Sequence, residues 1–245
     1  MSPPMAIAAG ADQQVNIAGE AMLLTAARAV VWPARRALIV ADLHIGKAAS
    51  FRSRGTPIPR GTTVDTLTRL TLAIESYGIR CMFVLGDFLH ARQSLPPATL
   101  AALRAWRERH EGLQIVLVNG NHDRHAGPPP RELRVEVNEE VVAGPFVLAH
   151  HPRPSERGYV LCGHLHPAIR VAGRLDSVRL PCYWLRKAVG VLPAFGAFTG
   201  AHEIRPEPDD RIYVLAEERI LELPRGSSAH ERGRTAHRAA KNGRL

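Results

Sequence analysis

The amino-acid sequence predicts an α/β fold in which two mixed β-sheets pack face to face and are flanked by helices. In the first half, apolar strand-like runs alternate with segments of helical periodicity, as in a βαβ-wound sheet. Beyond residue 123, short strand-like runs separated by turns are typical of hairpins. The 245 residues are 45% hydrophobic, which suits one large core in a single domain.

The elements of the first half are predicted from hydrophobic periodicity. Strands are expected at residues 15–18, 21–25, 29–32, 37–41, 81–85 and 114–118. The run A-L-I-V-A at 37–41 is apolar throughout, as in a strand covered on both faces. Helices are expected at 63–77 and 97–110, where apolar residues recur at spacings of three and four.

The sequence pattern changes from alternating strands and helices to short strands after the chain-breaking G-P-P-P at 127–130. Valines at 135, 137 and 141 suggest the first strands there. Further strands are expected at residues 146–149, 159–162, 169–171, 178–180, 187–192, 211–215 and 219–223. Most of them are expected to pair as hairpins.

The two ends of the chain differ from the rest in composition. We expect a flexible N-terminus at 1–14, one folded domain at 15–224 and a basic disordered tail at 225–245. The net charge is +9, and the tail holds six Lys or Arg against one acid. Such a tail could add affinity for nucleic acid, but a solvated tail without a partner explains it equally well.

The sequence favours a soluble, cytoplasmic protein. No apolar stretch reaches the roughly 18 residues that span a bilayer, and the first residues lack the basic and apolar regions of a secretory signal. The three cysteines are an odd number without C-x-x-C spacing, so a disulfide framework is not indicated and a reducing compartment fits best.

Five short segments place acid, amide and imidazole side chains behind apolar runs. They are D-L-H at 42–44, G-D-F-L-H at 86–90, G-N-H-D at 120–123, H-H-P at 150–152 and G-H-L-H at 163–166. Because loops at the carboxyl ends of strands converge on one crevice of an α/β sheet, we expect these side chains to meet there. Together they can supply the ligands of a site for two metal ions.

Each segment alone has an ordinary structural explanation. Asp42 or Asp87 could be a helix N-cap, and Asn121 could be only a turn residue. Two histidines at His164 and His166 are more often plain surface or core imidazoles. The metal hypothesis therefore rests on all five segments occurring together.

The residue types indicate the metal and the chemistry. Asp, Asn and His without thiolate favour manganese, iron or zinc over magnesium or calcium. Two such ions can clamp a phosphoryl group and make hydroxide available near neutral pH. His122 could protonate a leaving group while Asp123 keeps it charged and oriented, although Asp123 could instead cap a turn.

Two further features are candidates for contact with substrate. A basic cluster follows the first motif and could face phosphates near the metals; it comprises Lys47, Arg52, Arg54 and Arg60. His90, at the end of G-D-F-L-H, could serve in catalysis or be an unremarkable loop imidazole.

The five segments, in this order, closely resemble the motifs of the calcineurin-like metallophosphoesterases, a family of four-layer sandwiches. The resemblance implies that Asp42, His44 and His166 hold one metal and that Asp87 bridges to a second. It further implies a set of ligands for that second metal, namely Asn121, His150 and His164. His151 is the rival of His150, which is preferred because it directly follows the strand expected at 146–149. His122 and Asp123 match the family's catalytic pair.

Within that superfamily, the chain looks most like the bacterial ligase-associated DNA-damage-response metallophosphoesterases. The similarity is carried by G-T-P-I-P-R-G-T-T at 55–63, by G-D-F-L-H, and by P-C-Y-W-L…V-L-P-A-F-G-A-F-T-G at 181–200. It implies a DNA endonuclease that works beside a DNA ligase and a helicase. G-D-F-L-H is also similar to the G-D-x-x-H of a related nuclease family, in which the histidine lies near the scissile phosphate.

Three functions are compatible with the sequence. The first is a phosphodiesterase of nuclease type that depends on two metal ions, Mn preferred with Fe or Zn as alternatives, and acts on DNA ends, nicks or single strands in repair. The alternative is a phosphatase or phosphodiesterase acting on nucleotides or other small phosphoesters. The third is a scaffold that keeps the fold without turnover, which the complete set of expected ligands argues against.

Overall fold

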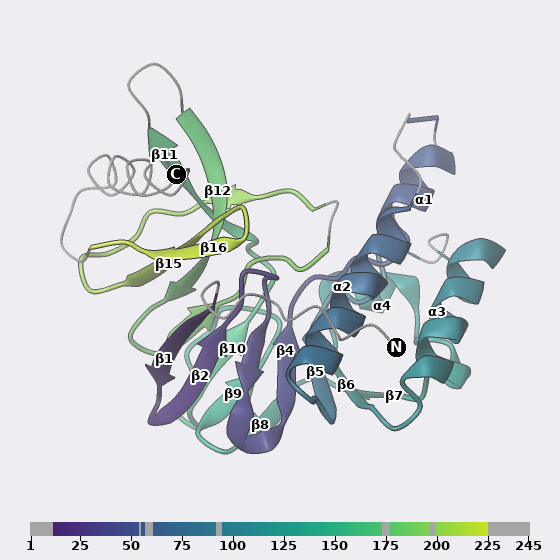
Figure 1. Ribbon diagram of the computed structural model, residues 1–245, viewed down its shortest axis with the longest axis horizontal. Helices are drawn as coiled ribbons and strands as arrows, with labels where there is room; N and C mark the ends of the chain where they lie inside the picture. The colour runs from purple at the N-terminus through teal and green to yellow at the C-terminus, as the bar shows by residue number, and fades with distance from the viewer. Residues whose placement is uncertain are drawn as a thin grey trace, which may run out of the picture.

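The computed structural model of the protein describes residues 12–53, 55–56, 61–91, 95–172, 177–196 and 199–224. Its core is a pair of mixed β-sheets packed against each other, with the helices gathered on one side (Figure 1). This confirms the predicted α/β sandwich. The predicted tail at 225–245 lies outside the described residues, as do residues 1–11 of the predicted flexible N-terminus.

The first sheet has seven strands in the order β1-β2-β3-β4-β5-β6-β7. Their bounds are β1 Gln13–Ile17, β2 Glu20–Leu24, β3 Val30–Trp32, β4 Ala37–Val40, β5 Cys81–Leu85, β6 Gln114–Val118 and β7 Val135–Asn138. The strands from β1 to β4 pair antiparallel, and those from β4 to β7 pair parallel. The predicted strands of the first half are all present, and β1 begins two residues before the predicted domain start at 15.

The α-helices of the described residues all precede Gly127 (Figure 1). They are α1 Lys47–Ser53, α2 Thr62–Ser76, α3 Pro97–Arg109 and α4 Asn121–Ala126, with two 3-10 turns, η1 Pro33–Arg35 and η3 Arg131–Leu133. α2 and α3 match the predicted helices, whereas α1 and α4 lie in segments expected to be loops. None of these helices combines the length and apolar character needed to cross a membrane.

The second sheet has nine strands, with β14-β11-β12-β13-β10-β9-β8 in order and β15 and β16 attached through β12. Their bounds are β8 Val141–Ala143, β9 Phe146–Leu148, β10 Tyr159–Cys162, β11 Pro167–Ala172, β12 Ser177–Leu185, β13 Val189–Val191, β14 His202–Glu203, β15 Arg211–Ala216 and β16 Arg219–Glu222. The expectation of mostly hairpins is wrong at the centre of this sheet, because β9, β10 and β13 run parallel. These three strands are almost entirely buried, as parallel strands usually are.

Alternation along the strands of the first sheet divides the core into two layers. In β4, Leu38 faces α2 and α3, while Ile39 faces the second sheet. The helix side also takes Leu70 of α2 and Trp106 of α3, and the layer between the sheets takes Phe146 and Tyr183. This inner layer fixes one sheet against the other and so sets how their ends line up.

Candidate metal centre

The five motifs lie in loops that follow strands of both sheets. Asp42 follows β4, Asp87 follows β5, and Asn121 follows β6 in the first sheet. His150 follows β9 and His164 follows β10 in the second sheet. All of these strands end at the same rim, as predicted, so loops distant in sequence meet there.

Hydrogen bonds join these loops in succession. The amide of His44 donates to the carbonyl of Asp87 over 2.8 Å. The amide of His122 donates to Asp87 Oδ1 over 2.9 Å, and the amide of His164 donates to Asp42 Oδ2 over 2.9 Å. The two buried carboxylates are therefore held by the backbone of neighbouring motifs.

The seven predicted ligands form two overlapping groups. In the first, donor atoms of Asp42, His44 and His166 lie within 4.8 Å of one another. In the second, Asn121 Oδ1 lies 2.9 Å from His150 Nε2 and 3.1 Å from His164 Nδ1. Asp87 lies between the groups, with Oδ2 3.7 Å from His44 Nε2 and Oδ1 3.6 Å from His150 Nε2.

The orientations of two imidazoles in this cluster fit a bound cation. His150 Nδ1 lies 2.9 Å from the carbonyl oxygen of Leu85, and His166 Nδ1 lies 3.1 Å from that of Gly200. Because a carbonyl only accepts, Nδ1 donates in each ring, and this orients Nε2 toward a carboxylate. His166 Nε2 lies 3.5 Å from Asp42 Oδ1, too long for a good hydrogen bond. Histidines that bind metals usually hold their second nitrogen in this way.

Burial shifts the pKa of two imidazoles of the cluster downward, whereas the nearby Asp42 carboxylate raises the pKa of His166 in spite of burial. Burial lowers the pKa of His44 to about 2 and that of His164 to about 4, assisted by neighbouring positive groups. The neutral imidazole is the form that binds metals. Burial also raises the pKa of Asp87, although His150 and the His122 amide oppose this. A bound divalent cation would stabilise the charge of that carboxylate.

The backbone of the rim is strained at the ligands. Five predicted ligands adopt left-handed conformations, with positive φ between 45° and 68°, namely Asp42, His44, Asp87, His164 and His166. Such conformations are uncommon outside glycine and concentrate at functional sites. The glycines of the motifs make room, since a Cβ on Gly86 would overlap the His150 ring and one on Gly163 would overlap the Asp42 carboxylate.

His122 lies beside the cluster, but its ring is not hydrogen-bonded to Asp123, the partner expected from the sequence. Its Nδ1 lies 2.9 Å from the carbonyl oxygen of His90, and the two rings stack with centroids 4.9 Å apart. Asp123 instead accepts from the amides of Leu89 and Gly120, each over 3.0 Å. His122 and Asp123 are successive residues of α4, and successive helical side chains point in different directions. Asp123 therefore caps the turn, the alternative considered from sequence.

The two adjacent histidines of H-H-P occupy different surroundings. His150 is buried against Asp87 and Asn121, whereas His151 is exposed. The His151 ring still lies 4.3 Å from that of His164, centroid to centroid, and the three imidazoles could share an ion. His150 thus lies within the cluster and His151 on its outer side.

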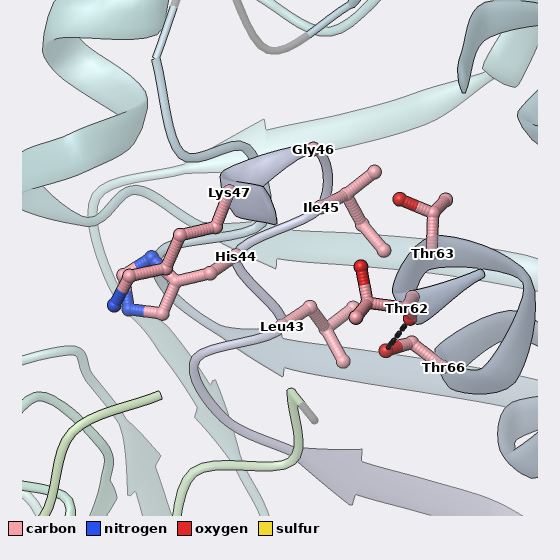
Figure 2. Close-up of a pocket in the computed structure, with 8 residues that line it drawn as sticks. All are labelled: Leu43, His44, Ile45, Gly46, Lys47, Thr62, Thr63 and Thr66. Atoms are coloured by element: carbon pink, nitrogen blue, oxygen red, sulfur yellow. Dashed lines mark hydrogen bonds between the residues drawn. The ribbon is translucent and has the colours of Figure 1, made fainter. Parts of the chain in front are cut away.

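The predicted basic cluster is only partly described. Lys47 begins α1 beside His44 and is half-buried near Asp42 and Asp87, whose charges oppose the lowering of its pKa by burial. Figure 2 shows His44 and Lys47 directed to the same side, away from the threonines at the start of α2. Arg52 lies in α1, while Arg54 and Arg60 lie outside the described residues.

Two positioning groups escaped the sequence analysis. These are the carbonyls of Leu85 and Gly200, which orient His150 and His166. Every residue carries a carbonyl, so no side-chain pattern could have revealed them.

Comparison with solved structures places the chain among known proteins. The crystal structure of the Pseudomonas putida nuclease MPE matches 86% of this chain and 100% of its own, with 44% sequence identity and a TM-score of 0.77. YfcE, a phosphoesterase from E. coli, matches 76% of this chain and 97% of its own at 12% identity, with a TM-score of 0.38.

Neither a scan against protein-family models nor a search of curated proteins gave a match. The 44% sequence identity to the nuclease MPE, over the full length of that nuclease, nevertheless establishes the family of this chain. The chain belongs to the calcineurin-like metallophosphoesterases, in the family of the Pseudomonas putida nuclease MPE.

Proposed function

We propose that this protein is a two-metal phosphodiesterase that cuts DNA as an endonuclease. The observation that carries the proposal is the convergence of the Asp42 and Asp87 carboxylates on imidazole Nε2 atoms whose rings are held by backbone carbonyls through Nδ1. Full-length similarity to a nuclease supports nucleic acid as the substrate. The half-buried Lys47, near both carboxylates, adds a positive charge for a phosphate.

In this proposal Asp42, His44 and His166 would hold one ion, and Asp87 would be shared with the second. The ligands of the other ion are Asn121, His150 and His164. Two bound divalent ions, Mn²⁺ with Fe²⁺ or Zn²⁺ as alternatives for this donor set, would supply hydroxide near neutral pH and neutralise the charge of the phosphoryl group.

The chain's own residues carry out the proton transfer and the orientation. His122 Nδ1 donates to the carbonyl of His90, which leaves Nε2 as the atom that gives a proton to the departing oxygen. His90 orients His122 through its backbone and through ring stacking. Asp123 holds the loops of residues 89 and 120 together and so fixes the start of α4.

The test compares substrates of different size. Protein reconstituted with Mn²⁺ is assayed on labelled linear, nicked and single-stranded DNA beside bis-p-nitrophenyl phosphate. We expect internal cleavage of DNA as well as hydrolysis of the small ester. Hydrolysis of only the small ester would overturn the nuclease function in favour of a small-molecule phosphoesterase.

We also propose a role in DNA repair beside a ligase and a helicase. The support is the resemblance of the motifs to ligase-associated enzymes, together with the similarity to a nuclease. If the role is correct, the cut should leave a 3′-hydroxyl and a 5′-phosphate, the ends that a DNA ligase joins. Products that purified DNA ligase cannot seal would contradict it.

A further inference from the structure

A cavity of about 190 Å³ adjoins the candidate metal centre on the side of His166. Arg28, Thr199 and Gly200 contribute to its lining, and Gly200 is the residue whose carbonyl orients His166. The volume is several times the roughly 30 Å³ that one water occupies in the liquid, so it can admit part of a ligand. No function proposed above uses Arg28.

Arg28 is held in an unusual conformation. It lies in the turn between β2 and β3 with a φ of +70°, in the left-handed region that arginine seldom adopts. Its amide donates to the carbonyl of Thr25 over 3.0 Å, and the Tyr183 hydroxyl lies 2.7 Å from that same carbonyl oxygen. The turn is therefore fixed from two sides, and it presents Arg28 to the cavity.

The guanidinium of Arg69 also supports this turn. Arg69 of α2 donates to the carbonyl of Ala27 over 2.7 Å and to that of Phe195 over 2.9 Å. It also lies 4.4 Å above the Phe195 ring. Arg69 thus joins the turn that carries Arg28 to the loop that carries Ala194, which also lines the cavity.

Among the described residues, neither of the two guanidiniums forms an ion pair with a carboxylate. The bond from Arg28 Nη1 to the Ala194 carbonyl is long at 3.4 Å. Burial and the charge of Arg28 together lower the pKa of Arg69 to about 10. The half-buried Arg28, whose guanidinium makes only the long hydrogen bond to Ala194 among the described residues, therefore brings positive charge to the cavity that an anion would stabilise.

We infer that Arg28 binds a backbone phosphate of the nucleic-acid strand, adjacent to the phosphate that is cut at the metal centre. The inference rests on the proposed function, because it assigns a neighbouring phosphate of the same substrate. His166 belongs both to the metal centre and to the cavity wall, so a strand that reaches the metals continues past Arg28. Arg69 is a positioning residue that keeps the turn of Arg28 in place.

The test replaces Arg28 by asparagine, which tolerates the left-handed conformation while losing the charge. The matched control is Arg134→Asn, an exposed arginine with a φ of +51° just before β7, at the opposite end of its sheet. For Arg28→Asn we expect kcat/KM on a single-stranded oligonucleotide to fall by about ten- to a hundredfold. Hydrolysis of bis-p-nitrophenyl phosphate, which has no neighbouring phosphate, should be unchanged. Equal losses on both substrates, or no loss on either, would overturn the inference.

Binding without turnover separates the inference from the proposed function. Anisotropy of a fluorescent oligonucleotide is measured in EDTA at several salt concentrations. For Arg28→Asn the slope of log K against log salt should be shallower by about 0.7, the value for one phosphate contact on a single strand, while Arg134→Asn keeps the wild-type slope. If the protein cleaves DNA but the slope is unchanged in Arg28→Asn, the role of Arg28 is refuted and the proposed function stands. A reduced slope in a protein that cleaves no DNA would instead refute the proposed function.

Discussion

The two sheets contribute different chemistry to the same rim. Loops of the seven-stranded sheet carry the oxygen donors Asp42, Asp87 and Asn121, together with His44. Loops of the nine-stranded sheet carry only imidazoles at the predicted ligand positions, His150, His164 and His166. One sheet therefore supplies the negative charge that attracts cations, and the other supplies imidazole nitrogen donors.

This difference means that neither sheet alone holds a complete set of the predicted ligands. Asp42 of the first sheet shares its group with His166 of the second, and Asp87 shares its group with His150. The buried layer between the sheets, with residues such as Ile39 and Tyr183, brings these partners together. Formation of the site is thus a consequence of sheet docking, and variants can test each side separately.

The largest effect is expected when the first sheet loses its bridging charge. Asp87→Asn should lower hydrolysis by on the order of a thousandfold or more, because several kcal/mol of charge stabilisation by the metals is lost. Metal content, measured by plasma mass spectrometry, should fall as well. The control Asp65→Asn changes an exposed carboxylate of α2 and should leave both quantities unaltered. Full activity with two bound metals in Asp87→Asn would disprove the assignment.

The next largest effect is expected for proton transfer, which we assign to His122, a residue that follows β6 of the first sheet. His122→Ala keeps the backbone N–H that bonds to Asp87, so metal binding should persist. Cleavage of DNA, whose leaving group is poor, should slow by roughly 10²- to 10⁴-fold, whereas a p-nitrophenyl ester should be far less affected. Equal losses on the two esters, compared by their kcat values, would remove the general-acid role.

Because the predicted ligands come from both sheets, metal binding should also stabilise the folded state in which the sheets are docked. With Mn²⁺ at about a hundred times its Kd, the folded state gains about 2.7 kcal/mol, which raises Tm by roughly 5–10 °C. Calorimetry with and without EDTA measures this shift. Asp87→Asn should show a smaller one, and a metal-saturated wild-type protein with an unaltered Tm would contradict the coupling.

The contact between the sheets at the rim can be tested with paired glycine variants. Gly86→Ala places a Cβ against the His150 ring, while Gly19→Ala has a similar positive φ and open space around it. Both should lose about 1–2 kcal/mol from backbone strain, and Gly86→Ala should lose roughly 1–3 kcal/mol more from overpacking. Urea unfolding gives the difference, and equal destabilisation would show that the rim yields to the added methyl group.

The smallest effect is expected at the exposed neighbour of a second-sheet ligand. His151→Ala should change the free energy of unfolding by less than about 0.5 kcal/mol and leave activity near the wild-type level. His150→Ala, which removes a buried donor facing Asp87, should abolish activity. The reverse ranking of the two variants in a hydrolysis assay would make His151 the ligand.

The sequence was sufficient to predict the strands and the rim because both depend on short-range patterns. The buried run at 37–41 and the helical spacing in α2 have clear periodicity, and a polar residue behind a buried strand marks its carboxyl end. β9 and β10 were predicted as strands, but their parallel pairing depends on tertiary contacts that periodicity does not encode.

The missed elements have weaker signals. α1 buries only Ala48 and Ser50 and has no acidic residue in its first turn, so its segment lacks an amphipathic pattern. α4 begins at Asn121 within the G-N-H-D motif, and only its helical geometry shows that Asp123 points away from His122. The charge of Arg28 becomes informative only when the fold places it near His166.

The left-handed backbone at five of the ligands limits how this chemistry can be moved to another scaffold. Grafting the seven side chains onto loops of ordinary geometry would aim them in other directions, since each side chain leaves its Cα at an angle set by φ and ψ. A protein engineer would need to transfer the loops whole, with their glycines and their cross-loop hydrogen bonds.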